Sequence, residues 1–76
     1  MESPQTIGER IKLIMQVYGM NPNSFSVTIG QGPATTDKII KEKNKPGYEY
    51  ICAILRAFPR VNARWLLLGA GTIFAK

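Results

Sequence analysis

The sequence predicts an all-α domain of five helices. Apolar residues recur every three to four positions in successive segments, which is the spacing of one face of an α-helix. Start and stop signals separate these segments, with a capping residue or a proline before most of them and a glycine or proline after them. Only residues 72–74 at the end of the chain have the character of a short extended segment.

Capping signals place the starts of the helices. Thr6, with Glu9 three residues later, fits a capping box in which each side chain accepts the backbone amide proton of the other residue. Asn21 and Asn62 are N-cap residues, and Pro33 is expected at the first position of a helix. The expected helices cover residues 6–18, 22–29, 33–42, 48–58 and 63–68.

The apolar faces of these helices predict the core. Trp65 is expected to pack inside because its neighbours are apolar and the domain is small. On the fourth helix we expect Tyr48 on the core side, Tyr50 more exposed, and Cys52 as a buried, unreactive thiol. The expected inward residues of the third and fourth helices are Thr36, Ile39, Ile40, Tyr48, Ile51, Cys52, Ile54, Leu55 and Phe58.

The charge of the chain suggests a polyanionic partner. The net charge is +5, which favours nucleic acid but also lies within the ordinary solubility charge of a small domain. The distribution is more informative than the total, because four lysines fall within eight residues and only Glu42 opposes them. These lysines are Lys38, Lys41, Lys43 and Lys45.

Several classes of function are disfavoured by the composition. One cysteine and no histidine leave no disulfide framework, no zinc site and no Cys/His or Ser/His pairing. We therefore expect no enzyme, no cofactor, no metal and no small-molecule substrate. The segment MESPQT lacks the apolar centre of a signal peptide, and residues 65–68 are too few to span a bilayer. We expect a cytoplasmic protein without a membrane partner.

The middle of the chain resembles the helix-turn-helix of lambda repressor and Cro-type transcriptional regulators, the xenobiotic-response-element family. In FSVTIGQGPATTDKII, residues 25–40, Gly30 takes the place of the family's turn glycine, and Ile29 and Ile39 match its buried positions. KNKPGYEYICAILRAFP is similar to the stretch that follows the recognition helix, and FPRVNARWLLLGAG to the family's ending. The resemblance implies a lambda-repressor-like domain over residues 6–69, after a flexible N-terminus (1–5) and before a tail (70–76) that serves as linker or dimer contact.

Three positions depart from the family pattern. Ser26 stands where alanine is usual, and its hydroxyl needs a partner if it is buried. Thr36 replaces isoleucine or valine, which keeps the branched shape but loses apolar burial. Gln31 replaces a common apolar residue of the turn.

The resemblance implies that the first turns of the helix predicted at 33–42 meet bases in the major groove. Pro33 and Ala34 can make only apolar contact there, for instance with a thymine methyl. Asp37 can accept from cytosine N4, whereas Lys38 can reach guanine O6 and N7.

Other residues are candidates for contact with the DNA backbone. The amides near Asn21 and Asn23, at a helix N-terminus, can hold a phosphate, and Thr35 can donate to a phosphate or a base edge. Contacts of this kind position a protein without specifying sequence. The expected contacts at the end of the recognition helix and in the loop that follows it are Lys41, Lys43, Asn44 and Lys45.

Together these features imply a sequence-specific regulator that binds double-stranded DNA, of bacterial or phage type, and we expect a repressor. A homodimer on a two-fold operator is expected, with a dimer surface from residues 66–68, Ile73 and Phe74. The resemblance also suggests that the chain is the N-terminal piece of a longer repressor. Two alternatives remain open: a protein-interaction module that has lost DNA binding, and the antitoxin of a toxin–antitoxin pair.

Overall fold

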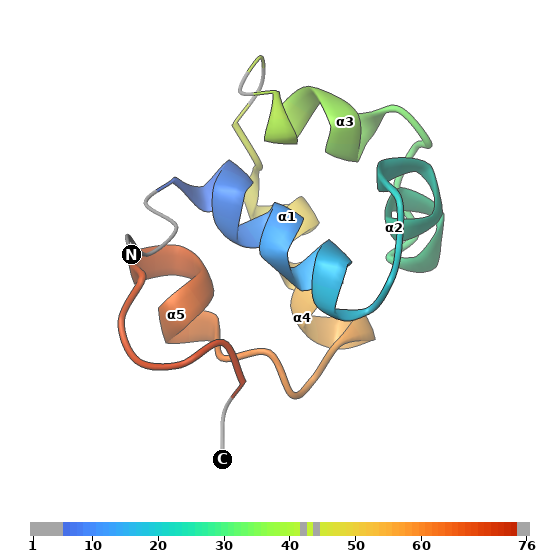
Figure 1. Ribbon diagram of the computed structural model, residues 1–76. Helices are drawn as coiled ribbons and strands as arrows, with labels where there is room; N and C mark the ends of the chain where they lie inside the picture. Colours follow the sequence, from blue (N-terminus) through green and yellow to red (C-terminus); the bar gives the residue numbers. More distant parts are fainter. Residues whose placement is uncertain (1–5, 42, 44, 75–76) are drawn as a thin grey trace.

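Five α-helices make up the part of the chain that the computed structural model describes, residues 6–41, 43 and 45–74. Figure 1 shows α1 in the middle of the fold, with α2, α3 and α5 around it. Helix α3 packs on α2 and α1, and α5 packs on α1. The all-α prediction with five helices is confirmed. The helices are α1 (Ile7–Val17), α2 (Pro22–Thr28), α3 (Thr35–Ile40), α4 (Tyr48–Ala57) and α5 (Ala63–Leu68).

Helix α1 begins at the predicted capping box. The Glu9 amide donates to Thr6 Oγ1 at 3.1 Å, and the Thr6 amide donates to Glu9 Oε1 at 3.1 Å. Gly19 follows the helix with a φ of +66°, and the amide of Met20 donates to the carbonyl of Met15 at 2.9 Å. This pattern is a Schellman C-cap, which requires a residue that accepts positive φ.

Helix α2 ends in the same way, and this ending forms the turn toward α3. Gly30 has a φ of +80°, and the Gln31 amide donates to the Ser26 carbonyl at 2.8 Å. The Gly30 amide donates to the Val27 carbonyl at 3.0 Å. These two bonds reverse the chain within a few residues, as the sequence predicts at Gly30.

Helix α3 is shorter than predicted at both ends. Pro33 and Ala34 lie in a turn, closed by the Thr35 amide donating to the Gly32 carbonyl at 3.1 Å, and the helix begins only at Thr35. Its N-cap position is Ala34, which has no side chain that can accept an amide proton. The predicted start at Pro33 is therefore wrong by two residues, and the predicted end at residue 42 is also too late.

The predicted exposure of the two tyrosines of α4 is wrong. Tyr48 is 81% exposed, whereas Tyr50 is only 4% exposed. The buried stripe of α4 consists of Tyr50, Ala53 and Ile54, which have the i, i+3, i+4 spacing of one helical face. The prediction places Tyr48, Ile51 and Cys52 on the buried face. In the structure the helix is rotated about its axis so that Tyr50 and Ala53 point inward instead. Cys52 is only half-buried.

Helix α5 has the predicted bounds, with Asn62 accepting from the Arg64 amide at 3.1 Å and Gly69 at a φ of +74°. The chain after it folds back onto its own domain. The Asn62 amide donates to the Ile73 carbonyl at 2.8 Å, and Phe74 forms an isolated antiparallel bridge with Val61. The expected extended segment thus pairs within the chain.

This arrangement changes the apolar surface expected for a dimer. Leu66 is fully buried inside the subunit, and Ile73 and Phe74 are half-buried against the core. Of the residues expected at a dimer surface, only Leu67 and Leu68 remain exposed.

Aliphatic side chains of α1, α4 and α5 and stacked aromatic rings fill the core. The rings of Phe25 and Phe58 are stacked 5.5 Å apart, and Trp65 is buried as predicted. Arg10 is also buried, and its Nε donates to the Leu66 carbonyl at 2.8 Å. A guanidinium at the last carbonyls of a helix interacts favourably with the helix dipole, so Arg10 ties α1 to the end of α5.

Candidate nucleic-acid interface

Three buried hydroxyl groups join α2, α3 and α4. Ser26 and Thr36 are fully buried, and Tyr50 is nearly so. The Thr36 amide donates to Ser26 Oγ at 3.1 Å, and Ser26 Oγ donates to Thr36 Oγ1 at 2.5 Å. Thr36 Oγ1 lies 2.6 Å from Tyr50 Oη. The two unusual polar residues of the sequence, Ser26 and Thr36, are therefore each other's partners.

Burial alters the chemistry of the third hydroxyl. It raises the pKa of Tyr50 above its ordinary value of 10.0, and the hydrogen bond with Thr36 offsets part of that rise. At neutral pH the hydroxyl is therefore protonated and available to the hydrogen-bonded chain. Among the described residues, no buried side-chain nitrogen or oxygen lacks a partner.

The start of α2 and the start of α3 share one shallow hollow. Its volume is about 410 Å³, and its lining comes from the start of α2 and from the residues around the start of α3. Five of the predicted DNA-contacting residues line it together with Pro22, so residues at least ten positions apart in the chain lie around one hollow. These five are Asn21, Asn23, Pro33, Ala34 and Asp37.

The amides at the start of α2 are less available than expected. The Ser24 amide donates to Asn21 Oδ1 at 2.8 Å, and the Asn21 amide donates to Ser24 Oγ at 3.2 Å. Pro22 has no amide proton. Of the described backbone from Asn21 to Ser24, only the Asn23 amide is left for a phosphate.

Two predicted contact residues are paired with each other. Lys41 Nζ lies 3.0 Å from Asp37 Oδ2, one turn away on the same face, and both side chains remain substantially exposed. A surface ion pair of this kind is worth about 0–1 kcal/mol, so DNA can displace it at low cost. While it persists, it neutralises both charges on the outer face of α3.

The remaining lysines of the cluster are exposed. Lys38 lies on α3, and the amide of Lys43 donates to the Lys38 carbonyl at 2.9 Å, which holds the following loop against the helix end. Lys45 lines a different hollow, of about 610 Å³, together with Thr35 and Gln31. Thr35 itself is half-buried. Asn44 lies outside the described residues.

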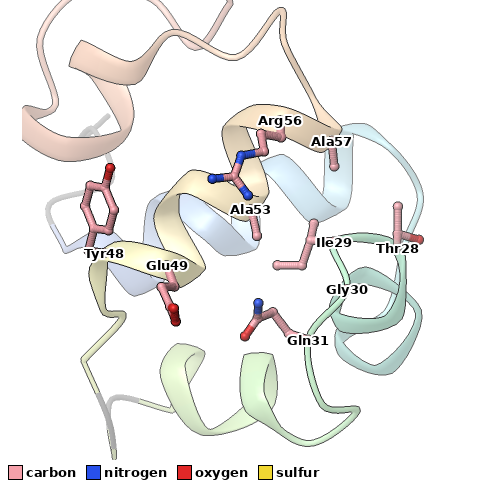
Figure 2. A pocket seen from close by; sticks show the side chains of 9 residues that line it. All are labelled: Thr28, Ile29, Gly30, Gln31, Tyr48, Glu49, Ala53, Arg56 and Ala57. Atoms are coloured by element: carbon pink, nitrogen blue, oxygen red, sulfur yellow. The ribbon is translucent and has the colours of Figure 1, made fainter.

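A groove that the sequence does not predict runs between the turn after α2 and helix α4 (Figure 2). Its volume is about 570 Å³. Gln31 extends toward this space from the turn, whereas Glu49 and Arg56 come from α4, so the lining carries both charge signs. The groove depends on how closely two distant segments approach, and no local pattern encodes that distance.

Two further observations concern the described residues as a whole. None of their helices is long and apolar enough to cross a membrane. Within the same part of the chain, no three His, Cys, Asp or Glu side chains gather where a metal ion could be held.

Comparison with known proteins gives no match: no family model, no curated protein and no solved structure is significantly similar to this chain.

Proposed function

We propose that the protein binds double-stranded DNA as a sequence-specific transcriptional regulator of the lambda repressor and Cro type. The observation that carries this proposal is the unit formed by α2, the turn at Gly30, and α3, whose outer surface gathers residues from both helix starts in one hollow. A helix pair of this kind can place its second helix in the major groove. A fold alone does not establish function, so the side chains on that surface matter more.

These side chains fall into two roles. Pro33, Ala34 and Lys38 are exposed around the start of α3, where they can meet base edges, and Lys38 is the one able to bind guanine. Lys43 and Lys45 are exposed in the loop that follows and suit phosphate contact, which positions the protein without selecting a sequence. The Asp37–Lys41 pair makes Lys41 a weaker phosphate contact than Lys43.

The proposal is tested by measuring affinity for duplex DNA across a salt series. Each phosphate that a lysine neutralises should contribute about −0.9 to the slope of log affinity against log salt. Duplexes selected from a random pool would supply the preferred sequence. Absence of salt-sensitive binding to any duplex at low ionic strength would refute the regulator proposal.

Single substitutions separate the two roles. Lys38→Ala should alter sequence preference by about 1–3 kcal/mol if Lys38 pairs with guanine. Lys43→Ala should weaken binding to all sequences similarly and reduce the salt slope by about one, and Lys41→Ala should do so to a smaller extent. Arg64→Ala is the matched control, because it removes the same charge from α5, on the other side of α1 from α3 (Figure 1). If Lys38→Ala leaves the preference unchanged, the assigned base-contacting face is wrong.

Two observations favour the alternative of a protein-interaction module. The exposed Pro33–Ala34 pair offers only apolar contact, and the Asp37–Lys41 ion pair occupies the Lys41 ammonium that would otherwise attract a phosphate. Such a module would show no salt-sensitive binding to DNA. An antitoxin would still bind DNA, and would be recognised by a requirement for a second protein.

A further inference from the structure

Helix α3 lacks an N-cap of its own, and α2 supplies one. The cap position is Ala34, whose backbone is already helical and whose side chain accepts nothing. An N-cap side chain normally accepts the amide proton of the second or third helical residue. Here Thr36 is the second residue of α3, and its amide donates to Ser26 Oγ in α2 at 3.1 Å.

We propose that Ser26, Thr36 and Tyr50 are positioning residues that fix the placement of α3 for contact with DNA. This inference rests on the proposed function and deepens it, because it concerns how the same surface is held in place. Ser26 acts as an N-cap supplied from another helix, and Tyr50 anchors the same hydroxyl chain to α4.

The argument rests on the directionality of hydrogen bonds. Apolar contacts between helices allow small sliding movements at little cost, whereas a buried hydroxyl that loses its partner is strongly disfavoured. Ser26, Thr36 and Tyr50 come from three different helices, are almost wholly excluded from solvent, and are linked at distances of 2.5–3.1 Å. A shift or rotation of α3 would break these bonds inside the protein, so the network selects one arrangement.

The position of Thr36 in the chain connects this network to the proposed DNA surface. Thr36 is followed directly by Asp37 and Lys38 and is preceded by Pro33, Ala34 and Thr35. Successive residues of an α-helix are rotated by about 100° around its axis. Anchoring Thr36 therefore also fixes the direction in which the Lys38 side chain projects from α3. The three hydroxyls are buried and act only through this placement.

Three variants test the inference. Ser26→Ala removes the cap. The double variant Thr36→Val with Tyr50→Phe removes two hydroxyls that are partners of each other. It keeps the cap, because the amide of residue 36 can still donate to Ser26 Oγ. The Ser26 hydroxyl, which loses its acceptor, can donate instead to a backbone carbonyl one turn earlier in α2. Thr36→Ser is the conservative variant, because it keeps the hydroxyl. Circular dichroism at the assay temperature verifies that each variant is folded.

The first readout is binding to the duplex selected from a random pool and to a scrambled duplex of the same composition. We expect Ser26→Ala and the double variant to lose about tenfold in affinity for the selected duplex, the size of one lost base contact. Binding to the scrambled duplex, which depends on exposed lysines, should be unchanged. Thr36→Ser should retain the wild-type ratio of the two affinities. A folded double variant with that same ratio would overturn the inference.

The second readout does not depend on DNA. Amide hydrogen exchange at Ile39 and Ile40 of α3 should accelerate about tenfold in Ser26→Ala, as expected for a lost cap, while exchange at Ile14 of α1 stays the same. Equal exchange in α3 of the variant and the wild type would refute the positioning role. If the wild type binds no duplex, the proposed function fails, and the exchange rates still decide whether these hydroxyls hold α3.

Discussion

At the scale of single residues, Tyr50 makes stability depend on pH. Its pKa is raised above 10.0, first by burial, so the folded state favours the protonated hydroxyl more than the unfolded state does. A raised folded-state pKa means that this stability is fully present below the unfolded pKa and is lost as pH rises through the folded pKa. We therefore expect the free energy of unfolding to fall as the pH increases above about 10.

Denaturant unfolding between pH 8 and pH 11 measures this effect. Tyr50→Phe should lower stability at pH 8 by about 1 kcal/mol, because a hydrogen bond is lost, but should flatten the decline at high pH. Tyr48→Phe is the matched control. Tyr48 is largely exposed, although hydrogen bonding to the Cys52 thiol raises its pKa, and its removal should leave most of the decline in place. A decline of the same steepness in Tyr50→Phe would show that another group causes it.

At the scale of the elements, the turn between α2 and α3 depends on Gly30. Its φ of +80° lies in the left-handed region, which costs other residues roughly 1–2 kcal/mol. Space is not the limitation, since a Cβ at Gly30 would meet nothing within 4 Å. We expect Gly30→Ala to destabilise the domain by about 1 kcal/mol through backbone strain alone.

Gly47→Ala provides the comparison for this substitution. Gly47 is the N-cap of α4, with a φ of −86° that any residue adopts, and a Cβ at Gly47 would likewise meet nothing within 4 Å. Thermal unfolding should show Gly30→Ala melting several degrees below Gly47→Ala. Equal melting temperatures would mean that the turn relaxes to accept a side chain.

The helix ends show which boundaries can be predicted from the sequence. The start of α1 and both ends of α5 follow the prediction, because Thr6, Glu9, Asn62 and Gly69 act on amides and carbonyls within a few residues of themselves. The start of α3 does not, because its cap comes from Ser26, ten residues away in the chain. A sequence pattern that assigns helix starts from neighbouring residues cannot detect a cap of this kind.

The buried face of α4 differs from the prediction for a related reason. Counting apolar residues favours a face through Tyr48 and Cys52, whereas the buried face passes through Tyr50 and Ala53. Tyr50 is drawn inward by its hydroxyl contact with Thr36, and the small Ala53 gives little apolar signal in the sequence. At the candidate site, five of the predicted contact residues line one hollow, whereas the Asp37–Lys41 pair joins two residues that the prediction treats separately.

At the scale of the whole molecule, contacts between distant segments join α1 to the end of α5 and to the segment that follows α5. Arg10 binds the last carbonyls of α5, and Phe74 packs its ring edge-on against Tyr18 at 6.0 Å. A domain of this size buries only about 60–65% of its unfolded surface, so such ties between distant segments matter for its stability. Leu66 is fully buried within the subunit, whereas Ile73 and Phe74 remain partly accessible.

What remains exposed on α5 leads to a prediction about assembly. Leu67 and Leu68 are 45% and 71% exposed at the end of a helix on the other side of α1 from α3 (Figure 1). A homodimer formed through these leucines would leave both α3 surfaces free, as a two-fold operator with half-sites about 34 Å apart requires. We expect Leu68→Lys to shift the protein to monomer in sedimentation equilibrium with little change in melting temperature, because the side chain is on the surface.

Val17→Lys is the matched control for this substitution, since Val17 is an exposed apolar residue at the end of α1. It should leave the monomer–dimer equilibrium unchanged. Loss of the dimer should also weaken binding to a duplex with two half-sites but leave the affinity for a duplex with one half-site unchanged. Only on the duplex with two half-sites does binding of the first subunit hold the second subunit close to its site. A wild-type protein that is monomeric while occupying both half-sites would rule out the leucine interface, as would a Leu68→Lys variant that still dimerises.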